Sequence, residues 1–183
     1  MTLRKAGSTL PLETPHLRLL PHSPSHLLAL VESREQFEAQ SELRAADGLR
    51  EFFVSGEVSP EWLSRLRAST ATDPWVHGFV VVHRETGLAI GSAGFKGPPD
   101  DDGIVEIAYG IVPSHQGRGY ATEAAAALVA YAIESGQARR IRAHTLPTPN
   151  ASTRVLAKCE LQYIGEVIDP EDGLVWRWER AVR

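Results

Sequence analysis

A glycine-punctuated segment is the strongest candidate for chemistry in this sequence. Its residues Gln116, Gly117, Arg118 and Gly119 lead directly into the predicted helix 120–135. Glycines let backbone N–H groups converge without obstruction by a Cβ atom. The start of a helix adds four unpaired N–H donors and a partial positive charge. This combination predicts a site for a phosphate or pyrophosphate group, so we expect a phosphorylated cofactor here.

Two common phosphate-binding motifs do not fit this segment. A Walker loop ends in Gly-Lys-Ser/Thr, and the sequence has no such ending. A Rossmann fingerprint needs a third glycine, whereas Gly117 and Gly119 are followed by Thr122. The remaining pattern is Gln116-x-x-Gly119-x-Ala121.

The second candidate is Glu106, which stands alone as a charged residue in the apolar run 104–112. A carboxylate is rarely fully buried without a partner. Three interpretations of Glu106 are therefore open: it is a reactive carboxylate in a cleft, a solvent-facing strand residue or half of a structural salt bridge.

Composition limits the classes of function. The 183 residues suit a single domain over 1–183, with residues 1–10 as a loose tail. A net charge of −4 gives no electrostatic case for binding nucleic acid. The single cysteine, Cys159, excludes an internal disulfide and a cysteine-based zinc site. His22 and His26 have i,i+4 spacing, but Pro24 lies between them at a helix start, so we expect no metal.

The sequence also predicts no association with a membrane. No apolar run approaches the ~18 residues needed to span a bilayer, and the first fifteen residues lack the apolar centre of a signal peptide. Together with the cysteine content, these features favour the cytoplasm. A monomer and a homodimer are both compatible with the sequence.

The pattern of apolar residues, turn residues and caps predicts an α/β (α+β) fold with a mixed sheet. Strands are expected at 16–20, 75–83, 88–95, 104–112, 140–146, 161–168 and 174–178. Helices are expected from Pro24, from Pro60, over 120–135 and from Asn150 to about Lys158, with unassigned helical pieces over 34–58. The crossover helix 120–135 requires strands 104–112 and 140–146 to be a parallel pair.

This order of elements, with four sequence segments, resembles the GNAT superfamily of acetyl-CoA-dependent N-acetyltransferases, in its ribosomal-protein N-acetyltransferase-like branch. The loop motif is similar to the GNAT pattern Q/R-x-x-G-x-G/A. The four segments cover nearly the whole chain in matching order: LETPHLRLL (12–20), EIAY (106–109), QGRGYATEA (116–124) and NASTRVLAK (150–158).

The resemblance implies a GNAT fold in which the parallel strand pair splays apart to admit acetyl-CoA. It implies that Glu106 acts as general base on the acceptor amine and that Ser152 assists the departing thiolate, with Tyr109 and Tyr120 as rival donors. Trp62 is a candidate for the wall of the acceptor cleft. The implied cofactor-binding residues are Ile111, Val112, Gln116, Gly117, Arg118, Gly119, Tyr120, Ala121, Thr122 and Asn150.

Three positions depart from the family pattern. His16 replaces an arginine that precedes the first strand's leucine. Ala157 stands where many relatives carry a tyrosine as general acid. Glu160 replaces a glycine that ends the last helix. A left-handed conformation at Glu160 would cost about 1 kcal/mol relative to glycine, so the turn is expected to be either different or mildly strained.

The function implied by the resemblance is transfer of an acetyl group from acetyl-CoA to a primary amine, directly in a ternary complex. The acceptor is either a protein N-terminal amine or a small-molecule amine. A non-catalytic domain that binds or senses acyl-CoA is the alternative, because of the vacant tyrosine position and Glu160. Turnover with a panel of amines separates the two hypotheses.

Overall fold

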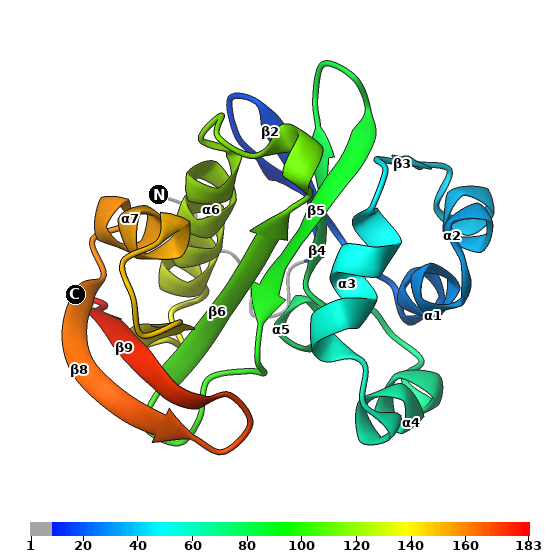
Figure 1. The fold of residues 1–183 in the computed structure, drawn as a ribbon. Coiled ribbons are helices and arrows are strands. Elements are labelled where there is room, and N and C mark those ends of the chain that lie inside the picture. The colour runs from blue at the N-terminus through cyan, green and yellow to red at the C-terminus, as the bar shows by residue number, and fades with distance from the viewer. Residues whose placement is uncertain (1–8) are drawn as a thin grey trace.

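The computed structural model describes residues 9–183, without the side chains of residues 56 and 57. The predicted tail 1–10 therefore lies almost wholly outside the described residues. Within them, one mixed sheet has the order β1-β2-β4-β5-β6-β7-β9-β8, and β3 pairs in parallel with β5 (Figure 1). The strands are β1 (Leu12–Glu13), β2 (Leu17–Pro21), β3 (Arg44–Ala45), β4 (Phe79–His83), β5 (Leu88–Phe95), β6 (Ile104–Ile111), β7 (Arg140–Thr145), β8 (Gln162–Asp169) and β9 (Gly173–Ala181).

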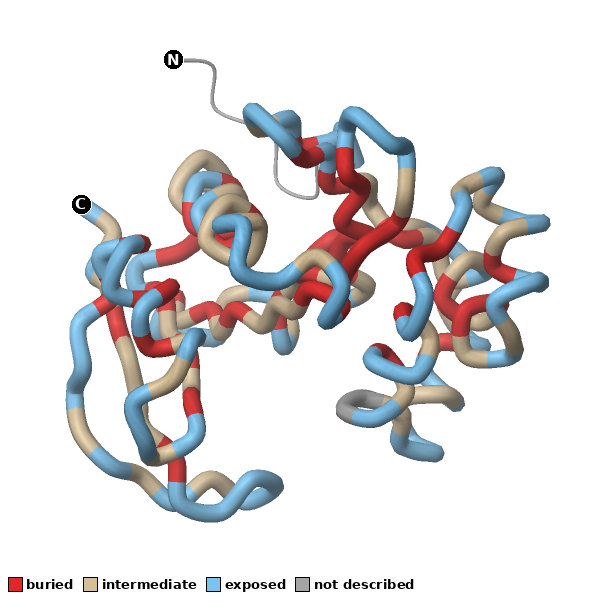
Figure 2. Tube along the Cα trace, turned by 45° about the horizontal axis from the view of Figure 1, so that its top comes forward, coloured by how far each residue is buried: buried red, intermediate tan, exposed pale blue. Residues whose placement is uncertain are grey.

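Helices cover both sides of this sheet. In Figure 1, α6 and α7 lie on one side of β6, and α1 to α4 lie on the other. The helices are α1 (Pro24–Glu32), α2 (Arg34–Ser41), α3 (Leu49–Glu57), α4 (Pro60–Ala68), α5 (Pro74–His77), α6 (Tyr120–Ser135) and α7 (Ala151–Lys158), with a 3₁₀ turn η1 (Pro113–His115). Figure 2 shows the buried residues concentrated along the middle strands, while the outermost strand β8 is largely exposed.

The β6–β7 pair confirms the predicted parallel strands and is unusually short. Only three register pairs join them, and the last is Glu106 with Arg142. Beyond this point β6 continues to pair with β5, and β7 continues to pair with β9. The two strands therefore separate toward their carboxyl ends, as the sequence comparison implied.

Sequence patterns located most elements within one or two residues and failed at one junction. The strand predicted for 75–83 begins at Phe79, because Asp73 caps a short helix that Pro74 begins. This helix is too short for the spacing of its apolar residues to distinguish it from a strand. The Asp-Pro pair, which favours the start of a helix, was nevertheless present in the sequence. The strands β1 and β3 are too short for a pattern to reveal.

At the end of α7 the turn is of the strained kind, which was one of the two outcomes left open for Glu160. This residue adopts a left-handed conformation with φ of 64°. Arg180 compensates in part, since its guanidinium pairs with the Glu160 carboxylate at 2.8 Å and donates to the Cys159 carbonyl at 2.9 Å. The turn thus has the left-handed backbone conformation typical of glycine, although the residue is Glu160.

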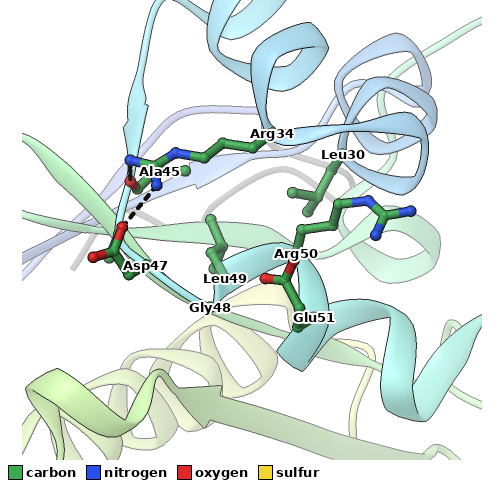
Figure 3. Close-up of a pocket in the computed structure, with 9 residues that line it drawn as sticks. Leu30, Arg34, Ala45, Asp47, Gly48, Leu49, Arg50 and Glu51 are labelled. Atoms are coloured by element: carbon green, nitrogen blue, oxygen red, sulfur yellow. Dashed lines mark hydrogen bonds and ion pairs between the residues drawn. The ribbon is translucent and has the colours of Figure 1, made fainter.

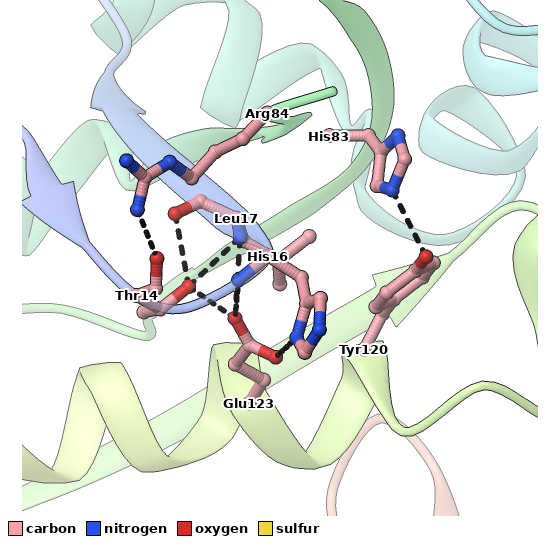
Figure 4. A network of polar contacts seen from close by, with 7 residues as sticks. All are labelled: Thr14, His16, Leu17, His83, Arg84, Tyr120 and Glu123. Atoms are coloured by element: carbon pink, nitrogen blue, oxygen red, sulfur yellow. Dashed lines mark hydrogen bonds and ion pairs between the residues drawn. The ribbon is translucent and has the colours of Figure 1, made fainter. Parts of the chain in front are cut away.

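A single carboxylate fastens the first hairpin to α6. Glu123 accepts hydrogen bonds from the N–H groups of His16 and Leu17, from the Thr14 hydroxyl and from the His16 ring (Figure 4). Burial acts to raise the pKa of Glu123, but these donors outweigh it and hold the pKa below its ordinary value. His16, which replaces the family's arginine, is thereby part of the anchor.

His22 is a buried histidine that should make the fold sensitive to acid. Its side chain is 1% exposed, and neither ring nitrogen has a hydrogen-bond partner among the described residues. Burial, reinforced by His26 and His77, lowers the pKa of His22 from 6.5 to about 3. Between these two pH values the unfolded chain binds a proton that the folded chain does not, so stability falls as the pH falls.

We therefore expect the free energy of unfolding to lose up to about 1.4 kcal/mol per pH unit below pH 6.5 through this residue. Urea unfolding at several pH values above the carboxylate range measures the slope. The variant His22→Leu should remove that contribution, and the neighbouring His26→Leu should retain it. Equal slopes in wild type and His22→Leu would contradict a neutral buried His22.

Candidate active site

The separation of β6 from β7 opens a cavity of about 200 Å³ between them. Its walls come from β5 and β6, from β7, from the start of α7 and from the β8–β9 turn. The lining residues are Lys96, Glu106, Ile107, Ala108, Tyr109, Ala143, His144, Ser152 and Asp172. The cavity thus includes both predicted catalytic residues, Glu106 and Ser152.

The two catalytic candidates approach the cavity from opposite faces of β6. Gly110 faces α3, because a Cβ atom there would lie 1.9 Å from the Phe52 ring. Side chains alternate along a strand, so Glu106 shares this face. Tyr109 faces the other side, where it interacts with Ser152 of α7. A group in the gap is therefore accessible to Glu106 from one face and to Tyr109 and Ser152 from the other.

Glu106 belongs to a chain of polar contacts. Its Oε1 atom lies 3.0 Å from Lys96 Nζ and 3.0 Å from His144 Nδ1. Arg177 Nε donates to His144 Nε2 at 3.3 Å, which assigns the ring proton of a neutral His144 to Nδ1, where it faces the carboxylate. Burial acts to lower the pKa of Lys96, but the Glu106 carboxylate outweighs it and raises that pKa. Glu106 is therefore both a residue that lines a cleft and half of a structural salt bridge.

Tyr109 and Ser152 form the opposite wall. Burial raises the pKa of the Tyr109 hydroxyl well above its ordinary value, and the contact with Ser152 lowers it only in part. Tyr109 is therefore a neutral hydroxyl that can donate a hydrogen bond. Tyr120, the other rival donor, hydrogen-bonds His83 Nε2 at 2.9 Å (Figure 4) and is not among the residues that line the cavity.

The free edge of β6 offers backbone groups to the gap. Lys96 N–H donates to the Glu106 carbonyl, and Val112 N–H donates to the Ile90 carbonyl, both at 2.9 Å. Because an antiparallel ladder alternates with a period of two, the backbone groups of Ile107, Tyr109 and Ile111 point away from β5 and toward the gap. Val112 directs its own N–H to β5.

The loop after β6 forms a cradle of N–H donors. Gly117 and Gly119 have φ of 74° and 83°, and Gly119 is the N-cap of α6. The N–H groups of residues 117–122 have no acceptor within the described part of the chain. A Cβ atom added at either glycine would meet nothing within 4 Å. Consecutive free N–H groups at a helix start are an anion-binding arrangement.

The Gln116 side chain holds the loop against the end of β6. Its side-chain Nε2 donates to the Ile111 carbonyl at 2.8 Å. The Gln116 side chain therefore fixes the loop, whose backbone is predicted to bind the cofactor, against the end of the strand. Arg118 is exposed beside the cradle.

Asn150 performs the capping role that its position predicts. Its Oδ1 accepts from Thr153 N–H at 3.1 Å, and Thr153 Oγ1 accepts from Asn150 N–H at 3.1 Å. Its Nδ2 donates to the Thr148 carbonyl at 3.0 Å. The second hydrogen of that amide and the second lone pair of Oδ1 remain for a ligand, so capping and cofactor binding are compatible.

Two further aromatic side chains, His115 and Trp62, are not among the residues that line the cavity. His115 is partly exposed and hydrogen-bonds Ser114. Burial, with Arg118 and His83 nearby, lowers the pKa of His115. Trp62 packs beside Phe53 with ring centroids 6.0 Å apart, and it is not among the described residues lining the cavity beside Glu106.

A larger hollow of about 380 Å³ lies among α1, α2 and α3 (Figure 3). Three of its charged side chains, Arg34, Asp47 and Arg50, already have partners. Arg34 contacts Asp47 and the Ala45 carbonyl, both at 2.7 Å, and Arg50 donates to the Val31 carbonyl. This hollow lacks the converging acid–base groups of the strand gap, so we assign the chemistry to the gap.

Lys96, His144, Arg177 and Asp172 escaped the sequence prediction. Lys96 lies between the predicted strands 88–95 and 104–112, and His144 lies within the predicted strand 140–146. A signal for His144 existed, because Arg142 and His144 alternate on the strand that must lie beside Glu106. Among the described residues, no group of three or more His, Cys, Asp or Glu side chains could hold a metal, and no helix is long and apolar enough to cross a membrane.

Comparison with known proteins agrees with this geometry. An uncharacterized N-acetyltransferase, YjdG of Bacillus subtilis, is 29% identical over 108 residues, covering 59% of this chain and 62% of YjdG. The chain thus aligns with less than two thirds of that relative's length. A GNAT-family acetyltransferase structure from Bordetella pertussis is 25% identical, with a TM-score of 0.61 over 94% of this chain and 99% of that one.

A ribosomal L7/L12 alpha-N-protein acetyltransferase, RimL, solved with coenzyme A, superposes with a TM-score of 0.65. It is 17% identical and covers 94% of this chain and 98% of its own, which establishes the shared fold. Residues 16–162 match the sequence profile of the acetyltransferase (GNAT) domain. The chain belongs to the GNAT family of acetyltransferases.

Proposed function

We propose that this protein transfers an acetyl group from acetyl-CoA to a primary amine, directly and within a ternary complex. The observation that carries the proposal is the end of β6–β7 pairing at Glu106 and Arg142. The resulting gap has a carboxylate on one face of the strand and two hydroxyl groups on the other. Direct transfer between two substrates requires this access from both faces.

The residues present suit acetyl-CoA. The cradle of N–H groups at 117–122 is suited to the pyrophosphate, and Arg118 adds positive charge. The backbone groups of Tyr109 and the N–H of Ile111, whose carbonyl already accepts from Gln116, are available to the amides of the pantetheine arm, much as an added strand would use them. A thioester in the gap would then lie beside Tyr109 and Ser152, whose hydroxyl groups can stabilise a departing thiolate.

The acceptor amine approaches from the face of Glu106. Its ammonium must lose a proton before it can attack, and Glu106 accepts that proton directly or through a water molecule. His144 and Arg177 fix the orientation of the carboxylate. The acceptor class includes protein N-terminal amines and small-molecule amines, because the cavity lining carries both charged and apolar groups.

Turnover with a panel of amines tests this proposal. The panel contains a peptide with a free N-terminus, a polyamine and an amino acid, each incubated with acetyl-CoA and the full chain. We expect coenzyme A release with an equal amount of N-acetyl product for at least one amine. Calorimetry measures acetyl-CoA binding separately. Tight binding without transfer to any amine would contradict catalysis and favour a domain that only senses acyl-CoA.

A further inference from the structure

Lys96 places a primary amine inside the proposed transfer site. Its Nζ atom lies 3.0 Å from Glu106 Oε1, and its side chain lines the cavity together with Tyr109 and Ser152. The side chain is 39% exposed. Lys96 is therefore held in the cleft by the carboxylate and is neither a core residue nor a free surface lysine.

An external acceptor amine has to satisfy the same two conditions. Its nitrogen must lie beside the carboxylate that receives its proton, and it must have access to the thioester in the gap. Lys96 satisfies the first condition through its distance to Glu106. It satisfies the second because it borders the same cavity as the Tyr109 and Ser152 wall.

We propose that Lys96 is an internal acceptor, which the protein acetylates on Nζ with acetyl-CoA as the donor. This inference rests on the proposed function. Glu106 takes one proton from the Lys96 ammonium, and the free Nζ forms a bond to the carbonyl carbon of the thioester. The carbon–sulfur bond breaks, and the departing thiolate takes the second proton. The products are Nε-acetyl-Lys96 and coenzyme A, with one proton released from Glu106 to solvent.

Acetylation would change the site that performs it. The modified side chain carries no charge, so its ion pair with Glu106 is lost. The acetamide would then occupy the acceptor end of the cavity. The reaction is therefore a single event for each protein molecule, and it competes with external amines.

The chain supplies an internal control for this reaction. Lysine occurs at three positions of the sequence, Lys5, Lys96 and Lys158. Lys158 is exposed at the end of α7. Lys96 is more shielded, and the Glu106 carboxylate favours its ammonium form. Uncatalysed acetylation should thus modify Lys158 at least as fast as Lys96, whereas catalysis within the site should reverse that order.

The experiment incubates the full chain with acetyl-CoA without an acceptor and follows both lysines by peptide mass spectrometry. We expect Lys96 to gain one acetyl group faster than Lys158. In Glu106→Gln the rate at Lys96 should fall by about 10²-fold or more, as for loss of a general base, while Lys158 is unaffected. Lys96→Arg, which keeps a positive charge beside Glu106, should show no acetylation at this position and the same level at Lys158.

Two results would overturn the inference. One is acetylation of Lys158 that equals or exceeds that of Lys96 and does not respond to Glu106→Gln. The other is an unmodified Lys96 in a preparation that acetylates an external amine, which leaves the proposed function intact. A chain that binds no acetyl-CoA in calorimetry would overturn the proposed function together with the inference.

Discussion

Replacing Glu106 with glutamine should lower the rate of acetyl transfer by about 10²–10⁴-fold, the usual contribution of a general base. Glutamine keeps the size of the side chain but cannot accept a proton. Cofactor affinity should remain nearly unchanged, because the N–H cradle lies at the other end of β6. The rate should recover in part at high pH, where more of the acceptor is free amine. Steady-state kinetics and calorimetry with acetyl-CoA measure the two quantities separately.

The contacts of Glu106 with Lys96 and His144 allow a purely structural role, which makes a different prediction. Loss of an ion pair would lower thermal stability and leave the rate near that of the wild type. Glu166→Gln is the matched control, because Glu166 is an exposed carboxylate that hydrogen-bonds Trp176 and is not among the residues lining the cavity. Wild-type turnover by folded Glu106→Gln at neutral pH would exclude the base assignment.

Replacing Gly119 with valine should weaken acetyl-CoA binding at least ~10-fold, or about 1.4 kcal/mol. The glycine has φ of 83° at the N-cap of α6, where a β-branched residue is strained. Its side chain would also enter the open space over the N–H cradle and prevent close approach of a phosphate. Calorimetry with acetyl-CoA and thermal unfolding would be measured on the same preparation.

Gly136 provides an unusually close control for this substitution. It caps the other end of the same helix with φ of 70°, and a Cβ atom there would also meet nothing within 4 Å. Gly136→Val should therefore cause similar backbone strain without affecting the ligand. Equal losses of affinity in both variants would attribute the effect to strain in α6, and unchanged affinity in folded Gly119→Val would exclude the loop from the site.

The sequence by itself determined most of the local structure. Helix starts at Pro24 and Pro60, the helix 120–135 and its end at Gly136 all follow from caps, proline and glycine, which act within a few residues. At Glu160 the sequence left a different turn and a strained left-handed turn open, and the structure has the left-handed one. The parallel strand pair followed from the length of the crossover between them.

The tertiary structure alone decided what surrounds each functional side chain. Nothing near Lys96 or Arg177 in the sequence indicates that they join Glu106 through contacts that span up to 38 positions. The local hydrogen bonds of the Asn150 and Gln116 side chains, which cap α7 and hold the loop against β6, are likewise visible only in the structure, and their predicted contacts with the cofactor stay predictions. Side-chain partners depend on register and on which face of a strand is covered. A local sequence pattern contains no information on register or on which face is covered. The charged cluster in the gap is therefore visible only in the structure, where the strands lie side by side.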